Sequence, residues 1–393
     1  MGSYDMSMPA TNNLRPLFLL RPDVIFLNHG SFGACPQPVF DTYQTWQREL
    51  ERQPVEFLGR RFNDLMRDAR RGLGAYLNAD AQDLVFVPNA TTGLNIVARS
   101  LRLEPGDEIL SNDQEYGALD RTWRFLCQRS GARYIRQPIP LPIRSTDEVI
   151  DAIWSGVTER TRVLFISHIT SPTAIVFPIA PLIERARAAS IITIVDGAHA
   201  PGQLPLDLVA LGADFYSGNC HKWMMAPKGS AFLYARRELQ HLVEPLIVSW
   251  GWESIMPGDS RFIDEQEYQG TRDIAAYLSV PAAIEFMRQH SWERVRADCQ
   301  ELLRYAYQQL SALPGLVACT PNSSEWLGQM AAFALPPGDG KQLKQRLYDE
   351  FKIEIPVGVI DERQFLRISL QGYNTRAEVD ALIEALGVLL PEV

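Results

Sequence analysis

The sequence predicts an α/β protein: a mainly parallel, seven-stranded sheet covered by helices, followed by a smaller α+β C-terminal domain. Two observations predict this fold class. Between Asp83 and Arg236, short apolar runs rich in β-branched residues alternate with amphipathic stretches. The apolar runs are nearly continuous, as expected of strands buried on both faces of a parallel sheet. After Thr271 the alternation gives way to long helical patterns with a few strand-like pieces between them.

The expected elements follow in chain order. The strands of the sheet are expected at Leu84–Val87, Glu108–Ser111, Arg133–Gln137, Arg162–Ser167, Ile191–Val195, Ala213–Ser217 and Ser230–Tyr234. Amphipathic helices are expected between them at Thr92–Leu101, Ala118–Gln128 and Ile179–Ala189. In the C-terminal part, the patterns indicate helices at Ala275–Gln289, Glu293–Leu313 and Arg376–Val388 and strands at Gln329–Ala334 and Phe365–Ser369.

The change of pattern also suggests how the chain divides. We expect a large domain over residues 33–274 and a small domain over residues 275–393. Residues 1–32 have no clear periodicity and are expected to pack against the small domain. The stretch Trp250–Gly270, rich in Gly, Trp and acidic residues, is expected to be a long loop, and such loops in compact domains are often functional.

Composition narrows the class of protein. The chain has 393 residues, a net charge of −9, a pI near 5.3 and no run of lysine or arginine, so no nucleic-acid partner is expected. No apolar stretch approaches the roughly 18–20 residues of a membrane span, so no membrane partner is expected. Residues 1–21 lack the pattern of a secretory signal. The five cysteines form no CxxC pair and are interpreted as reduced thiols of a cytoplasmic protein, and no metal site is predicted.

A first candidate site residue is Asp196 in IITIVDGAHA (Ile191–Ala200). It stands where an apolar strand ends and a glycine turn begins. Ligands of open α/β sheets bind beyond the carboxyl ends of the strands, which favours a functional carboxylate. The alternative is that Asp196 caps a following helix.

A second candidate is Lys222 in YSGNCHKWMMAPKG (Tyr216–Gly229). It follows another strand end, between His221 and Trp223. A single lysine is usually a solvated surface amine. Here the surroundings are apolar and aromatic, and a partly desolvated lysine is a usable nucleophile. Lys228 lies in the following turn and is interpreted as structural.

Two further segments contribute polar side chains. FVPNATTGL (Phe86–Leu94) is a strand, a polar turn and a helix start, which suits a phosphate, although Asn89 or Thr91 could simply be a helix cap. Because that turn is not GxGxxG, it argues against a nicotinamide enzyme. In LRISLQGYNT (Leu366–Thr375), Arg367 lies on an alternating strand, and an arginine fork matches a carboxylate.

Taken together, these segments resemble the class V aminotransferase superfamily of pyridoxal-5′-phosphate (PLP) enzymes over nearly the whole chain. The most specific part is the pair VDGAHA and HKW, with 26 residues from Asp196 to Lys222. Among relatives, the chain is most similar to isopenicillin N epimerase-type proteins. The segments that support this are LNHGSFG (Leu27–Gly33), QEYGALDRTWRF (Gln114–Phe125), SHITSPTA (Ser167–Ala174) and GNCHKW (Gly218–Trp223).

The resemblance implies the PLP-dependent transferase fold of the aspartate aminotransferase type, and roles for single residues. Lys222 would form the internal aldimine and move protons, while Asp196 would pair with the pyridine nitrogen. His199 would lie near the phenolic oxygen of the ring and Tyr116 would stack on the ring. Positions that match phosphate ligands are Thr91, Thr92, Asn219 and His221. Many relatives have Ser at position 219.

Other implied roles concern the substrate and the assembly. Arg367 matches the arginine that binds the carboxylate of an amino-acid substrate. Thr271 in QGTRD matches a residue that reaches the phosphate of the neighbouring subunit, which implies a homodimer with shared active sites. His29 or Tyr116 could supply a proton to the second face of the substrate.

The resemblance leaves the reaction open. Loss of the α-proton to a quinonoid can be followed by epimerisation or racemisation, by β-elimination in a C–S lyase of the hercynylcysteine sulfoxide type, or by transamination. A catalytically idle PLP-binding protein is a further alternative, against which the retained Lys222 and Arg367 speak. Cysteine desulfurases of this superfamily carry a nucleophilic cysteine shortly before the strand of Arg367. Here Pro356–Phe365 has none, and the nearest upstream cysteine is Cys319, so persulfide chemistry is not expected.

Overall fold

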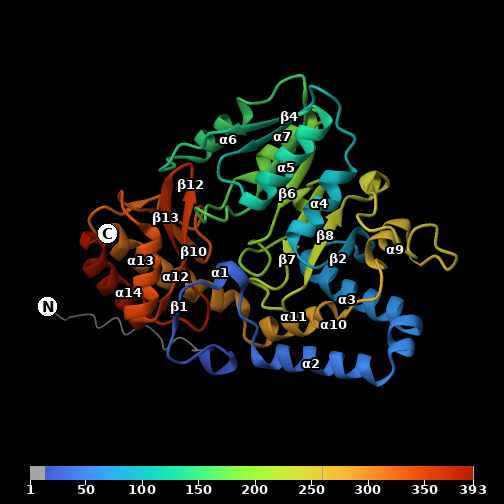
Figure 1. Cartoon of the computed structure of the whole chain (residues 1–393), viewed down its shortest axis with the longest axis horizontal. Helices are drawn as coiled ribbons and strands as arrows, with labels where there is room; N and C mark the ends of the chain where they lie inside the picture. The colour runs from blue at the N-terminus through green and yellow to red at the C-terminus, as the bar shows by residue number, and fades with distance from the viewer. Residues whose placement is uncertain (1–13, 259, 393) are drawn as a thin grey trace.

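The computed structural model describes residues 14–258 and 260–392, and a seven-stranded sheet lies at its centre (Figure 1). Its strands are β2 (Leu84–Val87), β3 (Glu108–Asn112), β4 (Arg133–Gln137), β5 (Thr161–Ser167), β6 (Ile192–Asp196), β7 (Phe215–Asn219) and β8 (Ala231–Ala235). They lie in the order β2-β8-β7-β6-β5-β3-β4, and β8 runs antiparallel to both of its neighbours. The predicted mainly parallel, seven-stranded sheet is confirmed, with every strand within two residues of its expected position.

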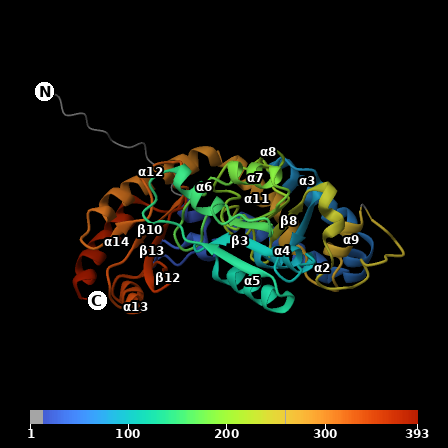
Figure 2. The ribbon, with the colours of Figure 1, turned by 90° about the horizontal axis from the view of Figure 1, so that it is seen from above.

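Helices cover both faces of this sheet, and others lie in the C-terminal part of the chain (Figure 1). The helices are α1 (His29–Phe32), α2 (Gln37–Arg52), α3 (Phe62–Leu77), α4 (Ala90–Ser100), α5 (Gly117–Ser130), α6 (Thr146–Trp154), α7 (Ile179–Ala188), α8 (Leu208–Leu211), α9 (Arg261–Glu267), α10 (Ala275–Leu278), α11 (Val280–Gln289), α12 (Trp292–Ser311), α13 (Gly340–Phe351) and α14 (Arg376–Leu389). The last three, α12, α13 and α14, are the helices of the C-terminal part. Figure 2 shows α5 below β3, and α6 and α7 above it. Neighbouring residues of one strand therefore join different cores: Ile109 and Phe165 pack in the layer of α4 and α5, whereas Leu110 and Ile166 pack in the opposite layer.

The C-terminal part forms a second, antiparallel sheet. Its strands are β9 (Val317–Ala318), β10 (Met330–Ala334), β12 (Val357–Ile360) and β13 (Arg363–Ser369), in the order β12-β13-β10-β9. The chain from Leu14 onward contacts this part: β1 (Ile25–Phe26) pairs in parallel with β11 (Ile353–Glu354). The proposed division at residues 32/33 and 274/275 stays a prediction. Residues 1–13, which hold most of the stretch without a secretory pattern, lie outside the described residues.

Two expected elements are corrected by the structure. The stretch Trp250–Gly270 is not all loop, because it contains α9, whose N-terminus is capped by the Ser260 side chain and which buries Phe262 in the core. The single helix expected at Ala275–Gln289 is two, α10 and α11. Pro281 has no N–H to donate to the preceding turn, so the helix restarts there with proline in its first turn.

A helix that crosses a membrane must be both long and apolar. Within residues 14–258 and 260–392, no helix has both the length and the apolar character that crossing a membrane requires.

Candidate active site

Asp196 and Lys222 lie at the carboxyl ends of two neighbouring parallel strands. β6 ends at Asp196, which is paired in register with Ser217 of β7, and Lys222 follows three residues after β7 ends. Asp196 is buried, and its Oδ1 accepts a hydrogen bond of 2.9 Å from the backbone N–H of Ala198. This contact closes a turn. The next helix, α8, begins only at Leu208, so Asp196 does not cap a helix.

The amine of Lys222 is enclosed in the protein although the side chain as a whole is half-buried. Its Nζ lies 3.2 Å from Nε2 of His199. Burial, and secondly the positive charge of Arg367, lower the pKa of Lys222 to about 7, while Asp196 opposes the shift. Lys222 is thus largely an uncharged amine just above neutral pH, the state in which a lysine is nucleophilic and basic.

His199 connects Lys222 to the aromatic interior. The indole Nε1–H of Trp223 donates to Nδ1 of His199 over 3.3 Å. Burial and the charge of Lys222 hold the pKa of His199 well below its ordinary value, so the imidazole is neutral. The ring of His29 also lies beside Trp223, with the ring centroids 4.8 Å apart.

The start of α4 lies beside the end of β7. Asn89 caps the helix, its Oδ1 accepting from the backbone N–H of Thr92 at 2.8 Å. Oδ1 of Asn219 accepts from the backbone N–H of Ala90 at 2.9 Å, so it joins β7 to α4. Asn89 is therefore a helix cap, which was the alternative to a phosphate-binding role for this turn. Thr91 is not, and it lies with Thr92 in the first turn, where the helix dipole and N–H groups favour a phosphate.

His221, the remaining predicted phosphate ligand, lies between Cys220 and Lys222. Its Nδ1 is 3.0 Å from the backbone carbonyl of Ser230, to which it donates as an N–H. Burial lowers its pKa to about 4, so the imidazole is neutral, with Nε2 left as an acceptor.

Tyr116 and Arg367 line one open pocket of about 480 Å³, although 251 residues separate them in the chain. Tyr116 precedes α5 and is 46% exposed, so its ring is accessible from the pocket. Arg367 lies on β13 opposite Ala332 of β10, and its guanidinium is buried.

Arg367 is held by neutral partners. One guanidinium nitrogen donates to the backbone carbonyl of Ser171 and a second to Oγ of Ser31, at 3.3 Å. Its Nε is buried without a hydrogen-bond partner. Burial lowers the pKa of Arg367 to about 10, which leaves it charged at neutral pH. A buried cation with an unused donor suits the carboxylate of a ligand.

Two predicted residues, His29 and Thr271, make no hydrogen bond to the side chain of Lys222, Asp196 or Arg367 among the described contacts. His29 is fully buried behind Lys222: Nε2 is 3.0 Å from the backbone carbonyl of Lys222 and Nδ1 is 2.9 Å from the Tyr373 hydroxyl. Because both ring nitrogens are engaged, this placement favours a structural role for His29. Thr271 is exposed, beyond the end of α9, and no described contact joins it to Lys222, Asp196 or Arg367.

Sequence reasoning missed Glu115, which is buried beside the site. Its Oε1 accepts from the backbone N–H of Ser167 at 2.9 Å and from the Asn112 amide at 2.6 Å, and its Oε2 contacts Oγ of Ser167 at 2.5 Å. Burial, with a contribution from the charge of Asp196, raises the pKa of Glu115 to about 8. The feature of the sequence that could have identified Glu115 as a site residue was its position, directly before Tyr116 and just after a buried strand.

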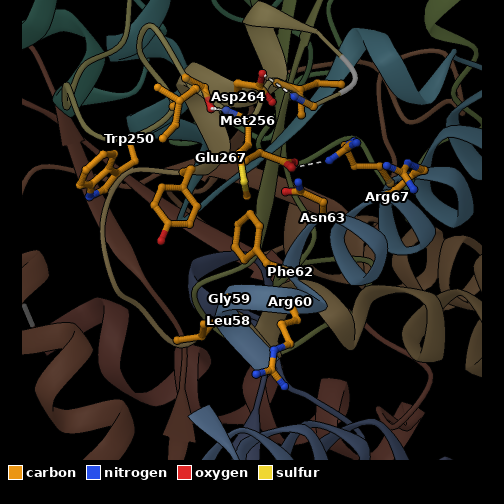
Figure 3. A pocket seen from close by; sticks show the side chains of 17 residues that line it. Leu58, Gly59, Arg60, Phe62, Asn63, Arg67, Trp250, Met256, Asp264 and Glu267 are labelled. Atoms are coloured by element: carbon orange, nitrogen blue, oxygen red, sulfur yellow. Dashed lines mark hydrogen bonds and ion pairs between the residues drawn. The ribbon is translucent and has the colours of Figure 1, made fainter. Parts of the chain in front are cut away.

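A second cavity, of about 300 Å³, lies away from these residues (Figure 3). Phe62, Trp250 and Met256 lie around it, and the buried ion pair of Arg70 and Glu267 closes one side. None of the predicted site residues lines it.

The donor set at the ends of β6 and β7 matches the functional groups of PLP. An uncharged amine (Lys222) suits the aldehyde, and a buried carboxylate (Asp196) suits a protonated pyridine nitrogen. The start of α4, with the hydroxyls of Thr91 and Thr92, suits the phosphate. The residues present therefore fit this cofactor.

Comparisons with known proteins agree. The family model described as "Aminotransferase class-V" matches residues 26–382. The chain is 39% identical to isopenicillin N epimerase of Amycolatopsis lactamdurans, covering 97% of this chain and 99% of that protein. It is 30% identical to a probable chloroplastic L-cysteine desulfhydrase of Arabidopsis thaliana, covering 94% of this chain and 83% of that protein.

Solved structures show the same fold. A complex of the cystine C–S lyase C-DES with cysteine persulfide superposes with a TM-score of 0.83 at 22% identity, covering 93% of this chain and 98% of that one. The expected PLP-dependent transferase fold is confirmed, and so is PLP as the cofactor, on the family match. The chain belongs to the class-V aminotransferase family of PLP-dependent enzymes.

Proposed function

We propose that the chain is an epimerase or racemase that removes and returns the α-proton of an amino-acid substrate, similar to isopenicillin N epimerase. The observation that carries the proposal is the 39% identity to the Amycolatopsis epimerase over 97% of the chain. Bound PLP supplies an electron sink that makes the α-proton of an attached amino acid acidic. The side chains around the cofactor bind and orient the substrate and move its α-proton.

Each polar side chain of the site has one task in this proposal. Arg367 binds the α-carboxylate through its guanidinium, which orients the α-carbon. The amine of Lys222, with its pKa lowered to about 7, takes the α-proton near neutral pH. The buried charge of Asp196 pairs with the cofactor's ring nitrogen, and His199 lies on the side of Lys222. Four residues would hold the phosphate: Thr91, Thr92, Asn219 and His221.

Epimerisation also needs a proton donor on the opposite face of the α-carbon. Tyr116 supports this role better than His29. Its side chain is 46% exposed and borders the same pocket as Arg367, whereas His29 is enclosed with both ring nitrogens engaged. Tyr116 therefore either stacks on the cofactor or donates the second proton.

The second candidate function is β-elimination by a C–S lyase, favoured by the 30% identity to the Arabidopsis desulfhydrase. The same α-proton removal by Lys222 begins that reaction. Desulfuration through a cysteine persulfide is not proposed, because β12 and β13 carry no cysteine and Cys319 is 3% exposed.

One experiment separates these functions. D- and L-amino acids are incubated with the holoenzyme in heavy water, and α-deuterium incorporation is measured together with pyruvate and ammonia release. Exchange with inversion and without release supports the epimerase. Release of pyruvate and ammonia supports the lyase, and transfer of the amino group to a 2-oxo acid supports an aminotransferase. No exchange with any amino acid contradicts all three.

The proposal includes a homodimer with shared active sites in the cytoplasm. Thr271 is exposed in one chain, so it is free to reach the cofactor phosphate of the partner subunit. The nearby surface exposes Trp250 (74%), Ile255 (86%) and Met256 (76%), an apolar area that a second copy would cover. The five unpaired cysteines are in keeping with a reducing compartment.

A complementation experiment tests the shared site. Lys222→Ala and Thr271→Glu are each expected to be inactive, the second because a carboxylate repels the phosphate. If Thr271 acts across the interface, mixed and reassociated chains recover about a quarter of the sites, since one site of each hybrid dimer is intact. No recovery, or an active monomer in sedimentation equilibrium, contradicts the shared site.

A further inference from the structure

The pocket that Arg367 shares with Tyr116 extends far beyond the place of an α-carboxylate. Residues of α5 form one wall, and residues of β12 and the turn after it, including Asp361, form another. Its volume of about 480 Å³ falls in the range of pockets that hold ligands much larger than a simple amino acid. Its far wall is thus available to the side chain of the substrate.

Four of the eight Asp, Glu and Arg side chains that line this pocket form ion pairs with one another. Arg124 lies 2.9 Å from Asp120 as an ion pair within α5. Arg136 bridges the two walls, because its guanidinium lies 3.1 Å from Asp120 and 3.7 Å from Asp361. These two guanidiniums already have carboxylates.

Two other guanidiniums that line the pocket, those of Arg367 and Arg121, form no ion pair with a carboxylate of the described residues. Arg367 donates only to neutral oxygens of Ser171 and Ser31. Arg121 is exposed, and its only hydrogen bond among the described residues is to the backbone carbonyl of Gly117, at 2.8 Å. Within residues 14–258 and 260–392, no carboxylate lies within ion-pair distance of either. Each is a cation in a ligand pocket with its charge free for an incoming anion.

We propose that the substrate is an α-amino acid with a second, distal carboxylate, which Arg121 binds while Arg367 binds the α-carboxylate. The inference rests on the proposed α-proton chemistry and names its substrate class. Arg121 lies next to Asp120, whose charge is already shared between Arg124 and Arg136 and so does not neutralise it. A guanidinium binds a carboxylate bidentately, which would hold the distal end of an extended substrate across the pocket.

The test compares acids with their own amides. α-Amino dicarboxylic acids of increasing chain length, each beside its ω-amide, are assayed for α-proton exchange, and binding is measured by calorimetric titration of the holoenzyme. For at least one chain length, kcat/KM is expected to favour the acid by about ten- to a hundredfold, as for hydrogen bonds to a charged group. Arg121→Gln is expected to lower this acid-to-amide ratio tenfold or more, in exchange and in binding alike.

A matched control removes the same charge from the same helix. Arg129 is on α5 but does not line the pocket, and it lies over the ring of Phe125. Arg129→Gln is expected to leave the acid-to-amide ratio unchanged. Equal exchange of acids and amides at every length, or the same loss of ratio in both variants, overturns the role of Arg121 while leaving the α-proton chemistry standing. If no amino acid exchanges, the proposed function fails, and the calorimetric ratio still decides whether Arg121 binds the distal carboxylate.

Discussion

Trp223 determines which nitrogen of His199 carries the proton. An indole N–H can only donate, so Nδ1 of His199, 3.3 Å away, must accept. The neutral ring then carries its proton on Nε2, and that N–H points to Nζ of Lys222 at 3.2 Å. It can donate only to a lone pair, so this arrangement is complete only when Lys222 is uncharged. The contact and the lowered pKa of Lys222 have the same consequence: a free amine near neutral pH.

Uptake of PLP by the apoprotein should therefore depend on pH with a midpoint near 7. Below that pH, Lys222 is protonated and has no lone pair for the aldehyde, and above it the amine is free. Stopped-flow absorbance from about pH 5.5 to about pH 11 measures the rate, with pyridoxal as a control for titration of the phosphate. A midpoint near the ordinary lysine value of 10.5 would contradict the role of burial.

Borohydride reduction and peptide mapping should place the pyridoxyl group on Lys222. A tag on Lys228, whose Nζ donates to the carbonyl of Gly33, would refute the assignment.

Replacing Asp196 should affect chemistry more than cofactor content. Asp196→Ala is expected to retain part of its PLP but to lose α-proton exchange by roughly a hundredfold, since a charge placed in a dry site contributes about 3 kcal/mol. Asp196→Asn keeps the shape and removes the charge, so it should lose exchange to a similar degree. Exchange rates close to wild type in either variant would show that the charge is not needed.

Arg367→Lys separates a substrate role from a structural one. Lysine cannot form the two parallel hydrogen bonds of a guanidinium, so amino-acid binding should weaken by about one to two orders of magnitude, the equivalent of about 1.5–3 kcal/mol. Kd is measured for an amino acid and for the matching amine, which lacks the carboxylate. Only the amino acid should lose affinity, with little change in melting temperature. Equal weakening of both ligands would mean that Arg367 does not bind the carboxylate.

Glu115 should make the protein less stable as pH rises. Its pKa is 4.5 in an unfolded chain and about 8 when folded, so between these values the unfolded state gives up a proton that the folded state keeps. This contribution to the free energy of unfolding is complete below pH 4.5 and is lost as pH rises to about 8. Glu115→Gln lacks it. From pH 5 to 8.5, urea midpoints should therefore fall less in Glu115→Gln than in wild type, by the equivalent of about 1 kcal/mol or more.

The control for this measurement is Glu293→Gln, at an exposed position of α12. It removes the same charge without the burial, so its midpoints should follow wild type across the pH range. Parallel pH dependence in all three proteins would mean that Glu115 ionises normally in the folded state.

The elements that could be predicted are those whose signal is local. A strand such as Ile192–Asp196 is buried on both faces and so consists of consecutive apolar residues, which the chain displays directly. The α9 helix was not predictable in this way. Its seven residues carry three acidic side chains, and its burial of Phe262 depends on the β2 side of the sheet lying beside it.

For the site, sequence alone identified residues at strand ends and, through the family resemblance, their roles. Asp196 and Lys222 could be expected to meet because carboxyl ends of parallel strands share one edge. Glu115 could not be singled out, because a carboxylate in a sequence gives no sign of its burial. Only the pairing of β5 with both β3 and β6 brings Ser167 between Glu115 and Asp196.

The sequence by itself determined the strands, their polar ends, the PLP-type residue set and the family. Tertiary structure alone decided the strand order, the reversal of β8, the enclosure of His29 and the meeting of Arg121 with Arg367 in one pocket. The physical reason is that local patterns record how each segment is buried. Which segments bury one another depends on packing and charge across hundreds of residues, and these act only once the chain has folded.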